Sequence, residues 1–266
     1  TIMSGNVTLL KHAPDVIGCA KAIENAFLEA GFPKGVFQQI TIDIPQVESV
    51  IASDIICGVT LTGSEKAGSS VASLAGKYIK KSVMELGGSD AFIVLHDADL
   101  EKAATVATQS RMLNAGQACI CAKRFIVTEK VADEFGVLFA QKIQSLQQGN
   151  PLQQGINMGP FARMELAEKL EHQLEQSLEQ GAKLILGGER ENCNFQPTLI
   201  DFVTVDSVAF QEETFGPLAT VIRAKDENDA VTIANNHRYG LASSIWTKDL
   251  ENAFQLARKM EAGNVF

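Results

Sequence analysis

A cysteine on a glycine-containing loop is the residue of this sequence with the clearest chemical potential. Cys119 lies in the segment Asn-Ala-Gly-Gln-Ala-Cys-Ile-Cys, residues 114–121, between a predicted helix and a predicted strand. Its sulfur could project into a cleft and attack an electrophile, with the thiolate as the nucleophile. Gly116 would let the backbone pass close to a ligand. A buried cysteine packed as a small apolar side chain fits the same pattern, so both interpretations stay open.

A glutamate at the end of an apolar strand is the second candidate. Glu85 lies in Met-Glu-Leu-Gly-Gly, residues 84–88, directly before a pair of glycines. A carboxylate that is partly buried there could act as a general base, because burial raises its pKa. A glutamate on the solvent face of an edge strand fits the segment equally well.

A glycine-containing turn joins a predicted strand to a predicted helix at residues 61–68. The amides of the helix N-terminus, together with the Ser64 hydroxyl between Gly63 and Gly68, could bind a phosphate. The spacing is neither G-x-G-x-x-G nor a P-loop. An ordinary helix cap is therefore the alternative.

Two more segments carry groups that could contact a ligand. Lys11 follows the first predicted strand, at the end of the sheet where α/β proteins hold ligands. Residues 212–217, Glu-Glu-Thr-Phe-Gly-Pro, place carboxylates and an aromatic ring beside a turn. A solvated lysine and a packed loop are the respective alternatives. Histidines and cysteines lack metal-ligand spacing, and no metal is predicted.

Composition narrows the class of protein that positions these residues. The chain has 266 residues and a net charge of -9, which disfavours nucleic acid and anionic membranes as partners. No apolar run approaches the ~20 residues that span a bilayer. Five cysteines, odd in number and mostly scattered, argue against a disulfide scaffold and favour a reducing cytoplasm.

The hydrophobic pattern predicts strands alternating with helices, hence an α/β fold with a largely parallel sheet. The glycine pair at 87–88 gives the expected division into residues 1–87 and residues 88–266. Asp15 is expected to cap a helix that reaches Ala30, with Gly31 as its stop. Other elements are expected near 5–10, 36–40, 57–61, 65–80, 83–86, 91–95, 99–113, 124–127, 131–148, 161–180, 183–186, 198–202, 218–222, 228–235, 243–246 and 250–260.

Six segments, taken in order, resemble the aldehyde dehydrogenase superfamily. They are LLKHAP, LTGSEKAG, MELGGSDAFIVLHDADL, NAGQACICAKRFIV, EETFGP and YGLASSIWT. Their order across nearly the whole chain is more specific than any single segment. The bacterial succinate-semialdehyde type is the nearest match. The resemblance implies an incomplete Rossmann-like NAD(P)-binding domain at 1–87 and a thiol-bearing catalytic domain at 88–266.

The resemblance also implies a reaction. Cys119 would attack the aldehyde carbon, and Glu85 would activate water to hydrolyse the resulting thioester. NAD or NADP would accept the hydride, and succinate semialdehyde would be oxidised to succinate. Glutarate semialdehyde, a neutral aldehyde, and a catalytically silent member with a binding or structural role are the alternatives. The family further implies a homo-oligomer, a dimer or tetramer, with a small aldehyde as substrate.

Cofactor contacts follow from the matching positions. Lys11 would contact the adenosine ribose, Gly63, Ser64 and Gly68 would hold the pyrophosphate, Glu213 would contact the nicotinamide ribose, and Phe215 would pack nearby. NAD-specific members often carry a glutamate three residues after this lysine, where the present chain has Pro14. NADP is therefore compatible with the sequence.

Substrate and redox roles are also expected. A semialdehyde acid needs a cation for its distal carboxylate, and Arg111 is the first candidate and Arg124 the second; ordinary packing or salt bridges are the alternative. Cys121, two residues after the nucleophile, could form a strained, reducible disulfide with Cys119 or simply pack against the strand.

Both ends of the sequence predict a piece of a longer enzyme. Residues 5–10 read as a buried strand without a leader, and residues 263–266 as a strand cut short. The family's P-W-N and P-F-G-G segments and its oligomerisation strand are missing. The Cys119 amide would then supply only half of an oxyanion hole, and little activity is expected of residues 1–266 alone.

Overall fold

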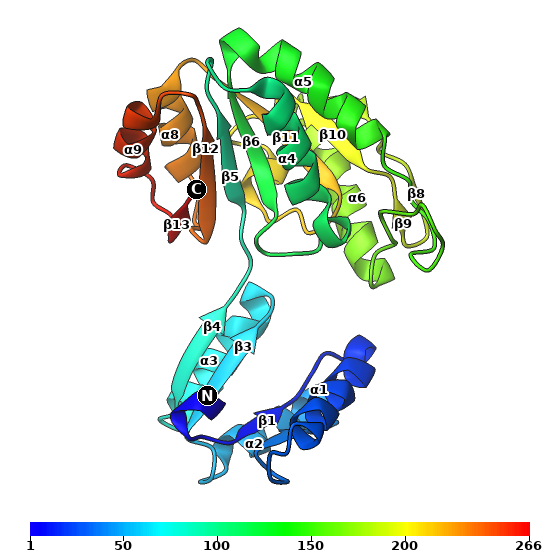
Figure 1. Ribbon diagram of the computed structural model, residues 1–266, viewed down its shortest axis with the longest axis vertical. Helices are drawn as coiled ribbons and strands as arrows, with labels where there is room; N and C mark the ends of the chain where they lie inside the picture. Colours follow the sequence, from blue (N-terminus) through cyan, green and yellow to red (C-terminus); the bar gives the residue numbers. More distant parts are fainter. The chain divides into compact units, whose positions relative to one another are not determined.

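The computed structural model describes residues 1–266, which divide into two compact units, Thr1–Leu86 and Gly87–Phe266 (Figure 1). The division falls one residue before the end of the first domain expected from the sequence. Both units are mixed α/β, and most paired strands are parallel, as predicted.

Two β-α-β motifs make up most of the first unit, and each closes a two-stranded parallel sheet. Their elements are β1 (Thr8–Leu10), α1 (Ile17–Glu29) and β2 (Phe37–Gln39), then β3 (Gly58–Thr62), α3 (Glu65–Lys77) and β4 (Lys81–Glu85). A short helix, α2 (Val47–Ala52), lies between the two motifs in the sequence. The parallel pairing places Lys11, Ser64 and Glu85 at or just beyond the carboxyl ends of strands.

Helix ends in this unit follow local chemistry. Gly31 has a φ of 85°, a conformation that glycine adopts without steric cost, and it directly follows the C-cap residue Ala30. Ser64 caps α3, with its hydroxyl accepting from the Ala67 amide. The expected cap at Asp15 is wrong. Asp15 lies in the 3₁₀ turn Pro14–Val16, and Val16 occupies the N-cap position of α1 without a side-chain hydrogen bond.

A seven-stranded sheet forms the centre of the second unit. Its strands lie in the order β13-β12-β5-β6-β11-β10-β7, and only β7 runs antiparallel to its neighbour. Their bounds are β5 (Asp90–Val94), β6 (Ala122–Thr128), β7 (Lys183–Leu186), β10 (Thr198–Asp201), β11 (Leu218–Ala224), β12 (Ala242–Trp246) and β13 (Asn264–Val265). A separate hairpin joins β8 (Arg190–Glu191) to β9 (Asn194–Phe195).

Helices cover both faces of this sheet (Figure 1). One face carries α4 (Leu100–Met112) and α5 (Glu129–Gln144); the other carries α6 (Met164–Glu179), α7 (Val208–Gln211), α8 (Glu227–Asn235) and α9 (Leu250–Ala257). Asp99 caps α4 by accepting from the Lys102 amide, as the sequence predicted for the start of this helix.

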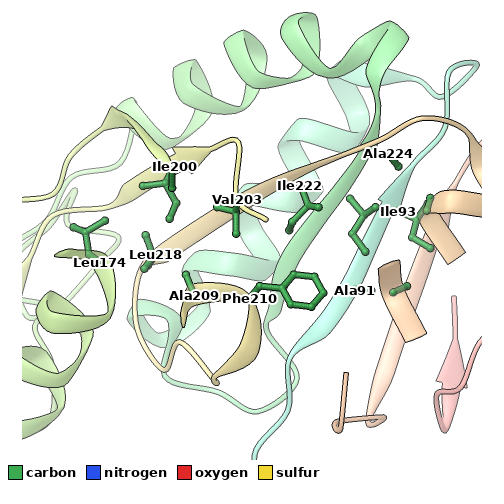
Figure 2. Close-up of a cluster of buried hydrophobic side chains, with 14 of the residues drawn as sticks. Ala91, Ile93, Leu174, Ile200, Val203, Ala209, Phe210, Leu218, Ile222 and Ala224 are labelled. Carbon is green, nitrogen blue, oxygen red and sulfur yellow. The ribbon is translucent and has the colours of Figure 1, made fainter. Parts of the chain in front are cut away.

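Side chains alternate between the two cores with the period of a strand. Along β5, Ala91 and Ile93 enter one cluster and Phe92 and Val94 the other. Figure 2 shows the first cluster, in which Phe210 from α7 lies beside strand residues of the sheet. Both faces are thus buried, which explains the near-continuous apolar character of the central strands.

Several short elements were not predicted. α2, α7, β8 and β9 have six or fewer residues each, too few to show a helical or strand period in the sequence. No helix has the length and apolar character needed to cross a membrane.

Candidate active site

Three loops of the second unit converge at the amino edge of its sheet. They precede β5, β6 and β11, which are neighbours and run parallel. The loops contribute the glycine pair Gly87 and Gly88, the Cys119 segment and residues 212–217. The geometry therefore brings together Cys119 and Glu213, two of the residues that the sequence singled out.

The backbone before Cys119 is left-handed over three consecutive residues. Asn114, Ala115 and Gly116 have φ values of 52°, 53° and 72°. This conformation is unfavourable for an alanine, so other contacts must hold it. A Cβ on Gly116 would overlap the Gly216 main chain and the Arg111 guanidinium. Only glycine permits this approach of the two loops.

Arg111 provides one of those contacts. Its side chain has no exposed surface, and its guanidinium donates to the carbonyl oxygens of Ala122, Gly116, Thr214 and Gly216. Burial lowers the pKa of Arg111 to about 10, so it remains charged at neutral pH. Nη1 and Nη2 thus bind the backbone of the two loops, as the packing alternative expects, and a role toward a substrate carboxylate stays a prediction.

Arg124, the second candidate for that role, is also structural. It is 2% exposed, donates to the carbonyls of Ser89, Ile233 and Ala234, and lies over the Phe210 ring. Two of these carbonyls belong to the last turn of α8. Arg124 therefore caps a helix C-terminus through Nη1, as the packing alternative expects, and its role toward a substrate stays a prediction.

Lys123 is a site residue that the sequence analysis missed. Its buried ammonium donates to the carbonyls of Ala118, Cys119 and Cys121, at 3.1, 3.0 and 3.3 Å. It also lies 3.6 Å from Oε1 of Glu213. Burial and the nearby Arg111 cation lower the pKa of Lys123 to about 8. No local pattern identifies this lysine, because its carboxylate partner is far away in the sequence.

Glu213 lies against the glycine pair. Its Oε1 accepts from the Gly88 amide at 3.1 Å, and a Cβ on Gly87 would overlap its carboxylate. A Cβ on Gly88 would lie 2.9 Å from the Cys119 carbonyl oxygen. Because the two glycines lack a Cβ, the Glu213 carboxylate and the Cys119 carbonyl can both pack against this segment.

Cys119 itself is partly exposed, and its main-chain amide donates to no protein group. Cys121 is buried, and its thiol donates to the Leu113 carbonyl at 3.6 Å. Both thiols are free. A disulfide between them would require the Cys121 sulfur to leave this contact, and it stays a prediction.

Gln117 fixes the loop from the other side. It exchanges hydrogen bonds with Asn114, and its Oε1 accepts from the Ala162 amide at 3.0 Å. This contact joins the Cys119 loop to the segment before α6. Gln117 was not among the predicted site residues, because its partner Ala162 is remote in the chain.

The first unit holds the other predicted site residues. Glu85 ends β4 and is exposed, so the partial burial expected of it is not found. Ser64 is exposed at the N-terminus of α3 and could bind an anion there. Lys11 is half-buried and donates to the His12 carbonyl at 3.2 Å. Phe215, in the second unit, is partly buried.

The two glycines of the Ser64 turn cannot bind a phosphate through their amides. The Gly63 amide donates to the Glu85 carbonyl, and the Gly68 amide donates to the Ser64 carbonyl. Gly68 is buried, and a Cβ there would overlap Leu86. The two glycines allow close packing of strand and helix, and the role of the turn in holding a pyrophosphate stays a prediction.

Comparison with known proteins defines the class. The aldehyde dehydrogenase family model matches residues 1–266, and the chain belongs to that family. It is 44% identical to the NAD(P)+ succinate semialdehyde dehydrogenase Sad of Escherichia coli K12 and 40% identical to the NADP+ succinate-semialdehyde dehydrogenase of Deinococcus radiodurans. All of the chain aligns, covering 58% and 56% of these relatives.

A solved structure shows the same fold. The succinic semialdehyde dehydrogenase of Streptococcus pyogenes in complex with NADP+ superposes with a TM-score of 0.95 at 37% identity. The match covers 98% of this chain and 58% of the other. The chain thus spans just over half the length of the relatives it matches.

Gly88→Ala tests the close approach at Cys119. The new methyl group would lie 2.9 Å from the Cys119 carbonyl, which is main chain and cannot move freely. We expect a loss of about 1–3 kcal/mol in the free energy of unfolding, measured by denaturant titration of Trp246 fluorescence. Gly136→Ala in α5 is the control. A Cβ there meets nothing within 4 Å, so it should stabilise by roughly 0.5–1 kcal/mol. Equal stabilities would contradict the prediction.

Asp90 at the start of β5 should give a pH-dependent stability. Burial raises its pKa from 3.8 to about 6, although the Ala242 amide and the Lys123 and Arg124 cations oppose this shift. The folded state then holds this proton more tightly than the unfolded state does. Its stabilising contribution is present below pH 3.8 and is lost as pH rises through about 6.

Asp90→Asn should remove this pH dependence. We expect the wild type to lose about 2.4 kcal/mol relative to the variant between about pH 4 and pH 7. Trp246 lies on the neighbouring strand β12 and reports unfolding of this unit. If the two proteins show the same change in unfolding free energy across this range, Asp90 does not carry the shifted pKa.

Proposed function

We propose that the intact protein oxidises succinate semialdehyde to succinate with NADP or NAD as hydride acceptor. The observation that carries the proposal is the state of Cys119. Its thiol is partly exposed, and its own main-chain amide donates to no protein group. Succinate-semialdehyde dehydrogenase activity is named for the relatives at 44% and 40% identity.

Cys119 would perform the first step. Its thiolate adds to the aldehyde carbon, and the carbonyl oxygen becomes an oxyanion near the Cys119 amide. Preorganised amides stabilise such a charge because they need no reorganisation during the reaction. The Arg111 and Lys123 contacts support this role, since they fix the backbone on both sides of the cysteine.

A nicotinamide cofactor, when bound, supplies the acceptor for the hydride lost from the substrate carbon. Two observations fit such a group. Ser64 presents an exposed helix N-terminus suited to a pyrophosphate, and Glu213 keeps Oε2 without a protein partner while Oε1 is held inward. Lys11 and Phe215 are the remaining residues proposed to contact the cofactor.

Glu85 would complete the reaction. Loss of the hydride leaves a thioester on Cys119, which water must hydrolyse. The Glu85 carboxylate would take a proton from that water, and the hydroxide would attack the thioester carbon, releasing the acid and the thiolate. An exposed carboxylate at a strand end can reach a water molecule, which supports this assignment.

Two variants separate these steps in the intact protein. Cys119→Ala should lower kcat with succinate semialdehyde and NADP+ by about 10³-fold or more, because no thioester can form. Glu85→Gln should give a burst of about one NADPH per subunit, followed by a steady rate at least about 10²-fold below wild type. Stopped-flow absorbance measures both.

The control is Glu129→Gln at the exposed start of α5, which should keep the wild-type burst and rate. Turnover by Cys119→Ala at the wild-type rate would exclude the thioester route. A Glu85→Gln variant without a burst would assign the water-activating role elsewhere. Faster turnover of glutarate semialdehyde or a neutral aldehyde would change the substrate and leave the chemistry intact.

Cofactor preference can be tested at Pro14. A carboxylate there should repel the 2′-phosphate of NADP and leave NAD unaffected. We expect Pro14→Glu to lower kcat/KM for NADP+ about ten-fold more than kcat/KM for NAD+, a difference of about 1.4 kcal/mol. Pro14→Gln controls for shape without charge. An equal effect of the two substitutions would show that charge at this position does not select the cofactor.

A further inference from the structure

A buried lysine links the two loops that the proposed function assigns to nucleophile and cofactor. The Lys123 side chain has no exposed surface, and all of its near partners are part of the site. It binds the carbonyls of Ala118, Cys119 and Cys121 and lies 3.6 Å from Glu213. A residue that only filled space at this position would not need an ammonium group, because burying a charge is costly.

The contacts at Glu213 are asymmetric. Oε1 faces inward, where it accepts from the Gly88 amide and faces the Lys123 ammonium. Oε2 packs against Gly87 and accepts no hydrogen bond from the protein, and 18% of the side chain is exposed. A carboxylate held by one oxygen presents the other in a defined direction, which suits a hydroxyl donor on a ligand.

We infer that Lys123 is a positioning residue that couples the Cys119 backbone to the Glu213 carboxylate, so that Oε2 is directed at a ligand hydroxyl. The inference rests on the proposed function and adds to it a residue that contacts neither substrate nor cofactor. It acts through charge as well as hydrogen bonds. A neutral amine could still donate to carbonyls, but it would no longer form an ion pair with Glu213.

The coupling should therefore depend on pH. The charged and titratable groups around the ammonium are Arg111 from α4, Asp90 from β5, Cys121 from its own loop and Glu213. Burial, the largest effect, and Arg111 lower the pKa of Lys123 to about 8, against the attraction of Glu213, Cys121 and Asp90. Below that pH the ion pair is intact; as pH rises through about 8, it is lost.

Binding of NADP+ to the intact protein tests this without turnover. In a Cys119→Ala background, which removes the reactive thiol from the titration, calorimetry should show the Kd rising about ten-fold from about pH 7 to about pH 9.5. Adding Lys123→Gln, which keeps N–H donors but no charge, should make the Kd nearly independent of pH. Its value at about pH 7 should match that of the parent at about pH 9.5.

Lys142→Met is the matched control, because Lys142 forms an exposed ion pair with Glu101 at 2.7 Å on α5 and α4. It should keep the pH step. Hydrogen exchange on the ligand-free protein tests the second contact of Lys123. Lys123→Met, which loses donors and charge, should speed amide exchange across residues 118–122 by about ten-fold, whereas Lys142→Met should not.

The outcomes distinguish the inference from the proposed function. NADP+ binding with the same pH step in the Lys123→Gln variant overturns the coupling and leaves the proposed function standing. If Lys123→Met leaves amide exchange across residues 118–122 unchanged, Lys123 does not stabilise the backbone of the Cys119 loop. If the intact wild-type protein binds neither NADP+ nor NAD+, the proposed function is wrong. The exchange experiment then still tests whether Lys123 stabilises the Cys119 loop.

Discussion

Buried cations bound to backbone carbonyls are the interaction on which the candidate active site depends. Arg111 and Lys123 donate to carbonyls on both sides of Cys119, and Arg111 reaches the loop before β11 as well. Without these donors, several buried carbonyls would lack partners, at about 1–3 kcal/mol for each one left unsatisfied. The left-handed backbone at Asn114 and Ala115 would also lose its support.

The position of the site in the sheet explains why cations fill this role. Ligand sites of open α/β sheets usually lie at the carboxyl ends of the strands, where helix N-termini point. Ser64 and Glu85 in the first unit follow that rule. Cys119 and Glu213 precede their strands, at the edge where α4 and α8 end. Helix C-termini present carbonyls and partial negative charge, and Arg124 caps one of them directly.

Local patterns and long-range partners explain what the sequence could and could not predict. The start of a helix at Asp99 and the glycine stop at Gly31 depend on neighbours within a few residues, and both were predicted correctly. The roles of Arg111 and Lys123 depend on partners about 90 to 105 residues away, which no local pattern reveals. Both arginines were candidates for binding a substrate, with packing as the alternative, because the role of a cation near a nucleophile is ambiguous until the partners of its donors are located.

Charge and close packing at the site require one another. Glu213 can accept a hydrogen bond from the Gly88 amide only because Gly87 has no Cβ. The Cys119 carbonyl can lie beside Gly88 because Gly88 has no Cβ either. That approach brings the carboxylate within 3.6 Å of Lys123 and so compensates part of the buried positive charge. A bulkier residue at position 87 would displace the Glu213 carboxylate from Lys123, and one at position 88 would displace the Cys119 carbonyl. Gly87 is thus an electrostatic requirement as well as a steric one, because its lack of a Cβ lets a carboxylate approach the buried Lys123 ammonium.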